Sequence, residues 1–228
     1  EGIRLLTLKR GSGVVTINGS FMGGDIYADD NNSRVPDLVS SMLDQGTTKQ
    51  TKFEISDKLE RAGARLSISN GKSNVGFYAK FLSDDLDMVL GLLSEQLQHP
   101  AFNEEDLEKA KKRMITSYKR KKESTRGSAV DNMLTNFYPK GHQNAPENND
   151  KSIEDIKKTT TKDLQDFHKD NYGKGGMVVV AVGDVNHVRD AQPEQRSGGD
   201  EGGGIVGAPN SCAHVCRQLG RRAYFVRV

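Results

Sequence analysis

The sequence predicts an α+β domain in which one antiparallel sheet carries helices packed on one face. Two pairs of strand-like segments alternate apolar and polar residues, and amphipathic helical segments follow each pair. A valine-rich run, residues 177–182, predicts one more buried strand near the end of the regular pattern. Helices that come in pairs between strand pairs pack on one face of an antiparallel sheet, so this order of elements indicates the fold class.

The chain begins with two predicted strands, residues 3–9 and 14–22, and Gly11-Ser12-Gly13 supplies the turn between them. Gly23-Gly24 ends the second strand. No GxGxxG or GxxxxGK[ST] pattern follows these glycines, so we interpret them as a turn and not as a nucleotide-binding loop.

A buried helix is predicted between Ser33 and Thr47. Its apolar stripe consists of Val35, Leu38, Val39, Met42 and Leu43. Residues 31–33 offer capping oxygens, Pro36 lies in the first turn where its missing N–H costs little, and Gly46 is placed to end the helix.

The next elements carry clear local signals. A capping box at residues 51–54 opens a helix that Gly63 closes. Two alternating segments, residues 64–68 and 75–81, flank Asn70-Gly71, which is a strong hairpin signal. A helix from about residue 82 then continues until Pro100.

A long helix is predicted from Asn103, as its cap, to about Ser124, with an acidic first turn. Its buried stripe comprises Leu107, Ala110, Met114 and Tyr118, and its other faces are rich in lysine and arginine. Two interpretations of these cations remain: a solvated surface, or a patch for a polyanion or an acidic partner domain. No aromatic residues alternate with the lysines, so the solvated surface is preferred.

The last elements are a helix over residues 129–137, a polar loop over 138–150, helices near 153 and 161, and the valine-rich strand. The apolar residues of the first of these helices are Val130, Met133, Leu134 and Phe137. We interpret His142 as a loop residue and His168 as a helix-surface or interface residue, not as ligands.

The chain is expected to form one domain over residues 1–185. Residues 186–228 form a glycine-rich and basic segment that we expect to be disordered, or to result from an altered reading frame. This segment contains Cys212, His214 and Cys216, but their spacing matches no common zinc site, so no metal is assigned there.

Charge and hydropathy exclude two classes of partner. The chain has 33 basic and 31 acidic residues, a net charge of +2, so no global field directs it to nucleic acid or to membranes. No apolar run approaches the roughly 18 residues of a membrane helix, so no membrane insertion is expected.

Four segments resemble the M16 family of zinc peptidases (insulinase, pitrilysin and mitochondrial processing peptidase). They are GGDIYADDNNSRVPDLVSSMLDQGT, ISDKLERAGARLSISNG, HPAFNEEDLEKAK and VVVAVGDV. The first segment resembles the part of the family that carries His-x-x-Glu-His, in which two histidines hold Zn²⁺ and the glutamate activates water.

The resemblance places Asp37 and Ser41 at the two histidine positions and Ser40 at the glutamate. The family's third ligand, a glutamate on the long helix, falls at Thr116 or Ser117. A serine hydroxyl is too weakly basic to replace these groups, and one aspartate cannot hold catalytic zinc alone. The resemblance therefore implies a domain with no catalytic residues, no metal and no cofactor of its own.

In that family, two similar halves close around an unfolded peptide and only one half carries zinc. The resemblance thus implies a non-catalytic bacterial domain that pairs with an active M16 half, in the periplasm or the cytoplasm. Two alternatives remain. One is a scaffold subunit of a larger complex without a proteolytic role, and the other is a metallopeptidase using Asp37 with distant histidines.

Overall fold

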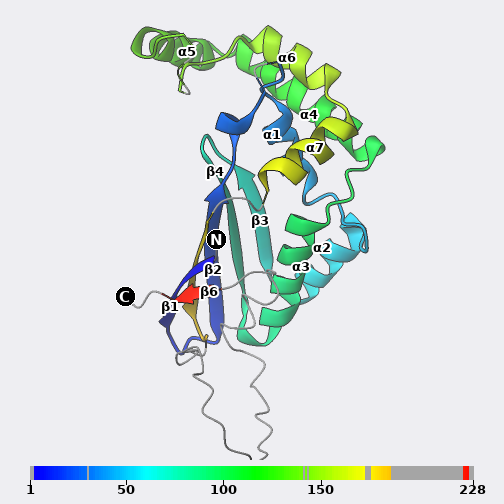
Figure 1. Ribbon diagram of the computed structural model, residues 1–228, viewed down its shortest axis with the longest axis vertical. Helices are drawn as coiled ribbons and strands as arrows, with labels where there is room; N and C mark the ends of the chain where they lie inside the picture. Colours follow the sequence, from blue (N-terminus) through cyan, green and yellow to red (C-terminus); the bar gives the residue numbers. More distant parts are fainter. Residues whose placement is uncertain are drawn as a thin grey trace, which may run out of the picture.

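The computed structural model describes residues 3–29, 31–140, 142, 144–172, 176–185 and 223–225. These residues form a six-stranded sheet with the order β3-β4-β2-β5-β1-β6. The strands are β1 (Ile3–Lys9), β2 (Val14–Met22), β3 (Arg65–Asn70), β4 (Asn74–Leu82), β5 (Met177–Gly183) and β6 (Ala223–Phe225). Helices lie along one face of the sheet (Figure 1), so the predicted α+β class is confirmed.

The helices occur along the chain in nearly the order and at nearly the positions that the sequence predicts. They are α1 (Val35–Met42), α2 (Lys52–Arg61), α3 (Leu86–Gln98), α4 (Glu104–Glu123), α5 (Thr125–Phe137), α6 (Asn149–Lys158) and α7 (Thr161–Asn171). Two short 3-10 helices, η1 (Asp25–Tyr27) and η2 (Ser83–Asp85), precede α1 and α3. In the described part of the chain, no helix combines the length and apolar composition needed to cross a bilayer.

The sheet is mixed and not wholly antiparallel, which corrects the sequence prediction. β5 lies between β1 and β2, parallel to β1 and antiparallel to β2. The turn at residues 11–13 therefore joins two strands that do not pair with each other. Alternation of apolar residues identifies a strand, but tertiary packing selects its neighbours.

One short strand belongs to the C-terminal segment: β6 pairs with β1 in parallel. Residues 186–222 and 226–228 lie outside the described residues, and so do Cys212, His214 and Cys216. The expectation that this segment is disordered or aberrant therefore stays a prediction.

Two apolar cores organise the domain. The first lies between the sheet and α3, and its fully covered members include Ile3, Leu5, Val15, Ile17, Val75, Ala79, Val89, Leu90, Leu93 and Val179. In this core Gly19 faces Phe77 across β2 and β4, and a Cβ at Gly19 would lie 2.1 Å from Phe77 Cζ. The phenylalanine ring thus fills the space that the glycine leaves.

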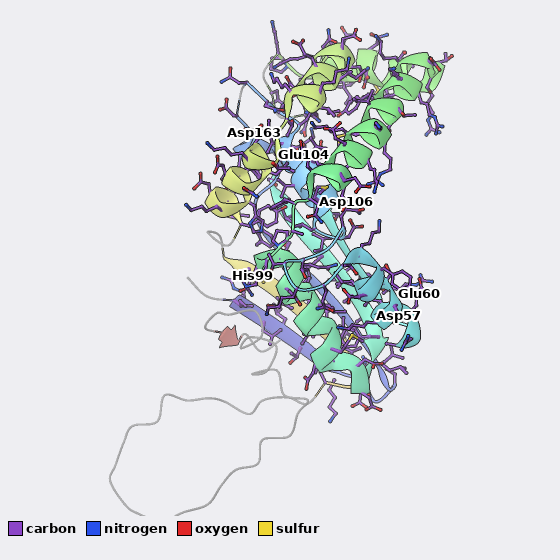
Figure 2. The ribbon with its side chains drawn as sticks, turned by 90° about the vertical axis from the view of Figure 1, so that its right-hand side faces the viewer. Asp57, Glu60, His99, Glu104, Asp106 and Asp163 are labelled. Carbon is purple, nitrogen blue, oxygen red and sulfur yellow. The ribbon has the colours of Figure 1, made fainter. Side chains whose placement is uncertain are left out.

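The second core joins α1, α4, α6 and α7 and so positions the helix that contains Asp37 and Ser40. Its buried members are Val35, Leu38, Val39, Met42, Phe102, Leu107, Ala110, Ile156 and Leu164. The acidic first turn of α4, where Glu104 and Asp106 lie (Figure 2), and its basic last turn match the helix dipole.

Three helix ends differ from the prediction. The N-cap of α1 is Arg34, without a side-chain cap, although Asn32 Oδ1 accepts a hydrogen bond from the Arg34 backbone N–H at 3.3 Å. The helix ends at Met42, ahead of Gly46, whose φ is 130°. Asn103 is the N-cap of α4 but its side chain makes no cap hydrogen bond. The capping box at Thr51 is confirmed.

The largest local difference concerns α5. This helix begins at Thr125, not at residue 129, and none of its residues is buried. Ser124 Oγ accepts a hydrogen bond from the Gly127 N–H at 3.2 Å and so caps the earlier start. Figure 1 shows α5 projecting from the end of the domain beyond α4 and α6. Periodicity predicts an apolar helix face, but it does not show whether the same chain covers that face.

Candidate functional site

The candidate site lies where the N-terminal end of α1 meets α4. Arg34, directly before α1, is held almost entirely inside, with 10% of its side chain exposed. Its Nη1 lies 3.1 Å from Asp37 Oδ2 and donates to Tyr118 Oη at 2.9 Å. Its Nη2 lies 2.8 Å from Glu147 Oε2, and its Nε donates to Ser33 Oγ at 3.1 Å. One guanidinium therefore links α1, α4 and the loop before α6.

The second oxygen of Asp37 extends this network to the sheet. Asn70 Nδ2, at the end of β3, donates to Asp37 Oδ1 at 3.0 Å and to Asp25 Oδ1 at 2.7 Å. Lys72 Nζ then lies 3.3 Å from Asp25 Oδ2. Asp37 thus accepts a hydrogen bond from the Arg34 guanidinium through Oδ2 and one from the Asn70 amide through Oδ1.

Burial and charge shape the protonation of this pair. Burial raises the pKa of Asp37, and the hydrogen bond from Asn70 opposes that rise. Burial also acts to lower the pKa of Arg34, but the charges of Tyr118, Glu147 and Asp37 outweigh it and raise that pKa. The guanidinium therefore stays charged.

Ser40 and Ser41 both lie in the region of α1 that follows Asp37. Ser40 is buried, with 8% exposed. Ser41 Oγ donates to the Leu38 carbonyl at 2.8 Å. The Ser41 hydroxyl is thus engaged within its own helix.

Thr116 and Ser117 lie on the exposed side of α4, away from α1. Thr116 Oγ1 donates to the Lys112 carbonyl at 2.8 Å, and both residues line a shallow basic depression with Arg113. The α4 residue that reaches the α1 network is Tyr118. The two residues that the resemblance aligns with the third family ligand therefore do not contact this network, and their alignment with that ligand stays a prediction. The helical stripe that contains Tyr118 is the sequence signal for the α4 residue that does contact it.

These residues do not fit the zinc ion that the resemblance associates with this position. In the described ranges, no three His, Cys, Asp or Glu side chains form a group able to hold a metal ion. A guanidinium has no lone pair to donate and carries a fixed positive charge. Arg34 Nη1 lies 3.1 Å from Asp37 Oδ2, so the guanidinium already places a positive charge where the resemblance would place zinc.

The two histidines singled out in the sequence lie apart from this network. His142 is exposed and stacks on Tyr138 with a centroid distance of 4.6 Å. His168 Nε2 lies 2.9 Å from the Leu97 carbonyl, and its ring packs against Tyr172 at 4.7 Å. His168 is thus an interface residue between α7 and the end of α3.

His168 predicts a pH dependence of stability. Burial lowers its pKa, and the charge of His99 adds to this, while the hydrogen bond with Leu97 opposes it. The unfolded chain therefore binds a proton near the ordinary pKa of about 6.5, before the folded chain does. The free energy of unfolding is fully retained above that pH and falls as the pH is lowered through it.

The measurement is urea unfolding at pH 7.5 and pH 5.0 for the wild type and for His168→Gln, whose amide can still donate to Leu97. The variant should lose less stability on acidification than the wild type. An equal loss in both proteins would show that His168 is not the group responsible.

The fold brings the start of α1 together with α4 around one buried guanidinium, that of Arg34. The chain belongs to the insulinase family, peptidase family M16, whose family model matches residues 9–150.

Known proteins similar to this chain are longer. The chain is 25% identical over 201 residues to the mitochondrial-processing peptidase subunit beta of Dictyostelium discoideum, covering 82% of this chain and 40% of that protein. The human subunit beta is 22% identical over 189 residues, with 82% and 38% covered.

Solved structures show the same fold. A peptidase M16 inactive domain from Pseudomonas fluorescens matches with a TM-score of 0.70 and 22% identity, over 79% of this chain and 44% of that one. A protease from Helicobacter pylori matches with a TM-score of 0.67 and 20% identity, over 82% and 46%. The chain thus spans less than half the length of each of these four proteins.

Proposed function

We propose that this chain is a non-catalytic M16 domain that pairs with a zinc-bearing M16 half and forms one wall of a peptide-binding chamber. The observation that carries the proposal is the Arg34 network, because a buried cation bridges Asp37 and Tyr118 between the motif helix and α4. The likeness to a structure described as an inactive M16 domain supports the same function.

Contact with a peptide is supported by the edge of the sheet beside α1. β3 is the outermost strand on that side, and the described residues place no strand next to it. An exposed strand edge binds an extended peptide through backbone hydrogen bonds. Asn70, at the end of this strand, is also a member of the Arg34 network, so the edge and the former motif position are coupled.

The test is co-expression of this chain with a zinc-bearing M16 half from the same genome. We expect a complex of the two by size-exclusion chromatography with light scattering. We also expect peptide hydrolysis by the complex, and neither hydrolysis nor stoichiometric zinc for this chain alone.

Two results would contradict the proposal. Chelator-sensitive peptide hydrolysis by this chain alone would show that it is a metallopeptidase after all. A zinc-bearing half that neither binds this chain nor changes its activity with it would favour the scaffold role.

A further inference from the structure

α5 presents an apolar stripe to solvent. Val130, Met133 and Phe137 recur at positions i, i+3 and i+7, which lie on one side of a helix, and their exposed fractions are 42%, 50% and 74%. No residue of α5 is buried, and α4 is the helix it packs on most closely. A helix of 13 residues with so little burial gains little stability from packing, so a further covering surface would stabilise it.

Basic residues are concentrated in the segments that precede and follow this stripe along the chain. Between residues 119 and 140 there are six basic residues (Lys119, Arg120, Lys121, Lys122, Arg126 and Lys140) and two acidic ones (Glu123 and Asp131), a net charge of +4. Lys121 and Lys122 form ion pairs, with Asp131 at 2.9 Å and with Asp150 at 2.6 Å. Within the described residues, Lys119, Arg120 and Arg126 form no ion pair. These cations are free to meet carboxylates from outside.

We propose that α5 and its basic surroundings dock a partner polypeptide that presents an apolar patch bordered by carboxylates. The apolar centre would be covered by the patch, and the basic flanking segments would be matched by charges of opposite sign. Where the partner is the zinc-bearing M16 half, this inference rests on the proposed function and names the surface of contact.

The distribution of charge favours a protein over a lipid surface. Helices that lie on membranes carry Lys and Arg on the polar face of the same helix. The charged residues of α5 itself are Arg126 and Asp131, which cancel, and its remaining polar positions are neutral. Apart from Arg126, the cations belong to the end of α4 and to the residues after α5, so they flank the helix and do not form its polar face.

The first experiment uses a defined probe. It is a fluorescein-labelled helical peptide of about 20 residues, with leucine every third and fourth position and glutamate elsewhere. A second peptide replaces each glutamate with lysine. We expect the acidic peptide to bind the wild type by fluorescence anisotropy, with affinity falling at least about tenfold in the double variant Met133→Asp/Phe137→Asp.

The matched control is Phe53→Asp. Phe53 is 78% exposed and lies on α2, at the other end of the row of helices from α5 (Figure 1). This variant should bind the acidic peptide like the wild type, and the lysine peptide should bind at least about tenfold more weakly than the acidic one. Thermal unfolding monitored by circular dichroism checks that the variants fold.

Four results would overturn the proposal. They are absence of binding by the acidic peptide, equal binding of both peptides, equal loss in the Phe53→Asp control, and α5-dependent binding to phosphatidylglycerol vesicles in place of the peptide.

The second experiment measures the complex with the zinc-bearing half. Weakening of at least about tenfold by Met133→Asp/Phe137→Asp would support α5 as the contact. If the zinc-bearing half binds the wild type and the double variant equally tightly, the proposed docking surface is wrong while the proposed function holds. If the acidic peptide binds through α5 but no M16 half does, the docking surface holds and the proposed function fails.

Discussion

Replacing Arg34 with methionine is expected to lower the free energy of unfolding by about 3 kcal/mol, because one partner of a buried charge network is removed. The side chain is 10% exposed and joins Asp37, Tyr118, Glu147 and Ser33. Methionine fills a similar volume but leaves the Asp37 carboxylate without its cation. The measurement is urea unfolding at pH 7.5, monitored by circular dichroism.

Two variants separate charge from geometry. Arg34→Lys retains the positive charge but cannot bond to Asp37, Tyr118 and Glu147 together, so its cost should lie between the wild type and Arg34→Met. The double variant Arg34→Met/Asp37→Asn removes both charges and should recover part of the loss. A loss below about 1 kcal/mol for Arg34→Met would show that the network is solvated like a surface ion pair.

The role of Arg34 could not have been predicted from its own neighbourhood. A lone arginine ahead of a helix is ordinarily a solvated residue. Its partners Tyr118 and Glu147 lie 84 and 113 positions further along the chain, so no local pattern connects them to it. The second core brings these segments together, and only the folded chain reveals the network.

Most elements could be predicted because their signals are local. The bounds of β1 and β2 match the predicted residues, and the hairpin around Asn70 pairs β3 with β4 in the expected antiparallel sense. The capping box at Thr51 fixes the start of α2. Each of these features depends on a few consecutive residues, which the sequence contains in full.

The properties that could not be predicted depend on packing between distant segments. The insertion of β5 between β1 and β2 makes the sheet mixed, and the strand patterns are the same for either order. The exposure of Phe137 likewise depends on what covers α5. At the candidate site, the resemblance singled out Asp37, Ser40 and Ser41. The contact of Tyr118 with Arg34 depends on which side of α4 faces α1, and the resemblance did not give that.

The network also explains why restoring the motif alone should fail. The triple variant Asp37→His/Ser40→Glu/Ser41→His would place two imidazoles and a carboxylate on α1. Arg34 would still set a positive charge beside the first of these positions, and α4 would still present the phenol of Tyr118. We expect this variant to bind no stoichiometric zinc and to hydrolyse no peptide.

Adding Arg34→Ala and Tyr118→Glu to the triple variant should create a zinc site. Arg34→Ala removes the cation. Tyr118→Glu supplies a carboxylate from α4, which together with the two introduced histidines makes a ligand set of two histidines and one glutamate, as catalytic zinc uses. Changing a group that only orients a zinc ligand alters the affinity for zinc by about 10–100-fold. A change that adds a ligand should have a larger effect, so we expect this variant to bind zinc at least about 100-fold more tightly than the triple variant. Zinc content by mass spectrometry and competition with a fluorescent chelator measure this.

The matched controls place the glutamate at position 116 or 117 and leave Tyr118 unchanged. Both positions lie on the exposed side of α4, so these variants should bind zinc no better than the triple variant. Tight binding with the glutamate at position 116 or 117, and none at 118, would contradict the phase of α4 described above. Circular dichroism is needed for each variant, because loss of Arg34 is itself expected to destabilise the domain.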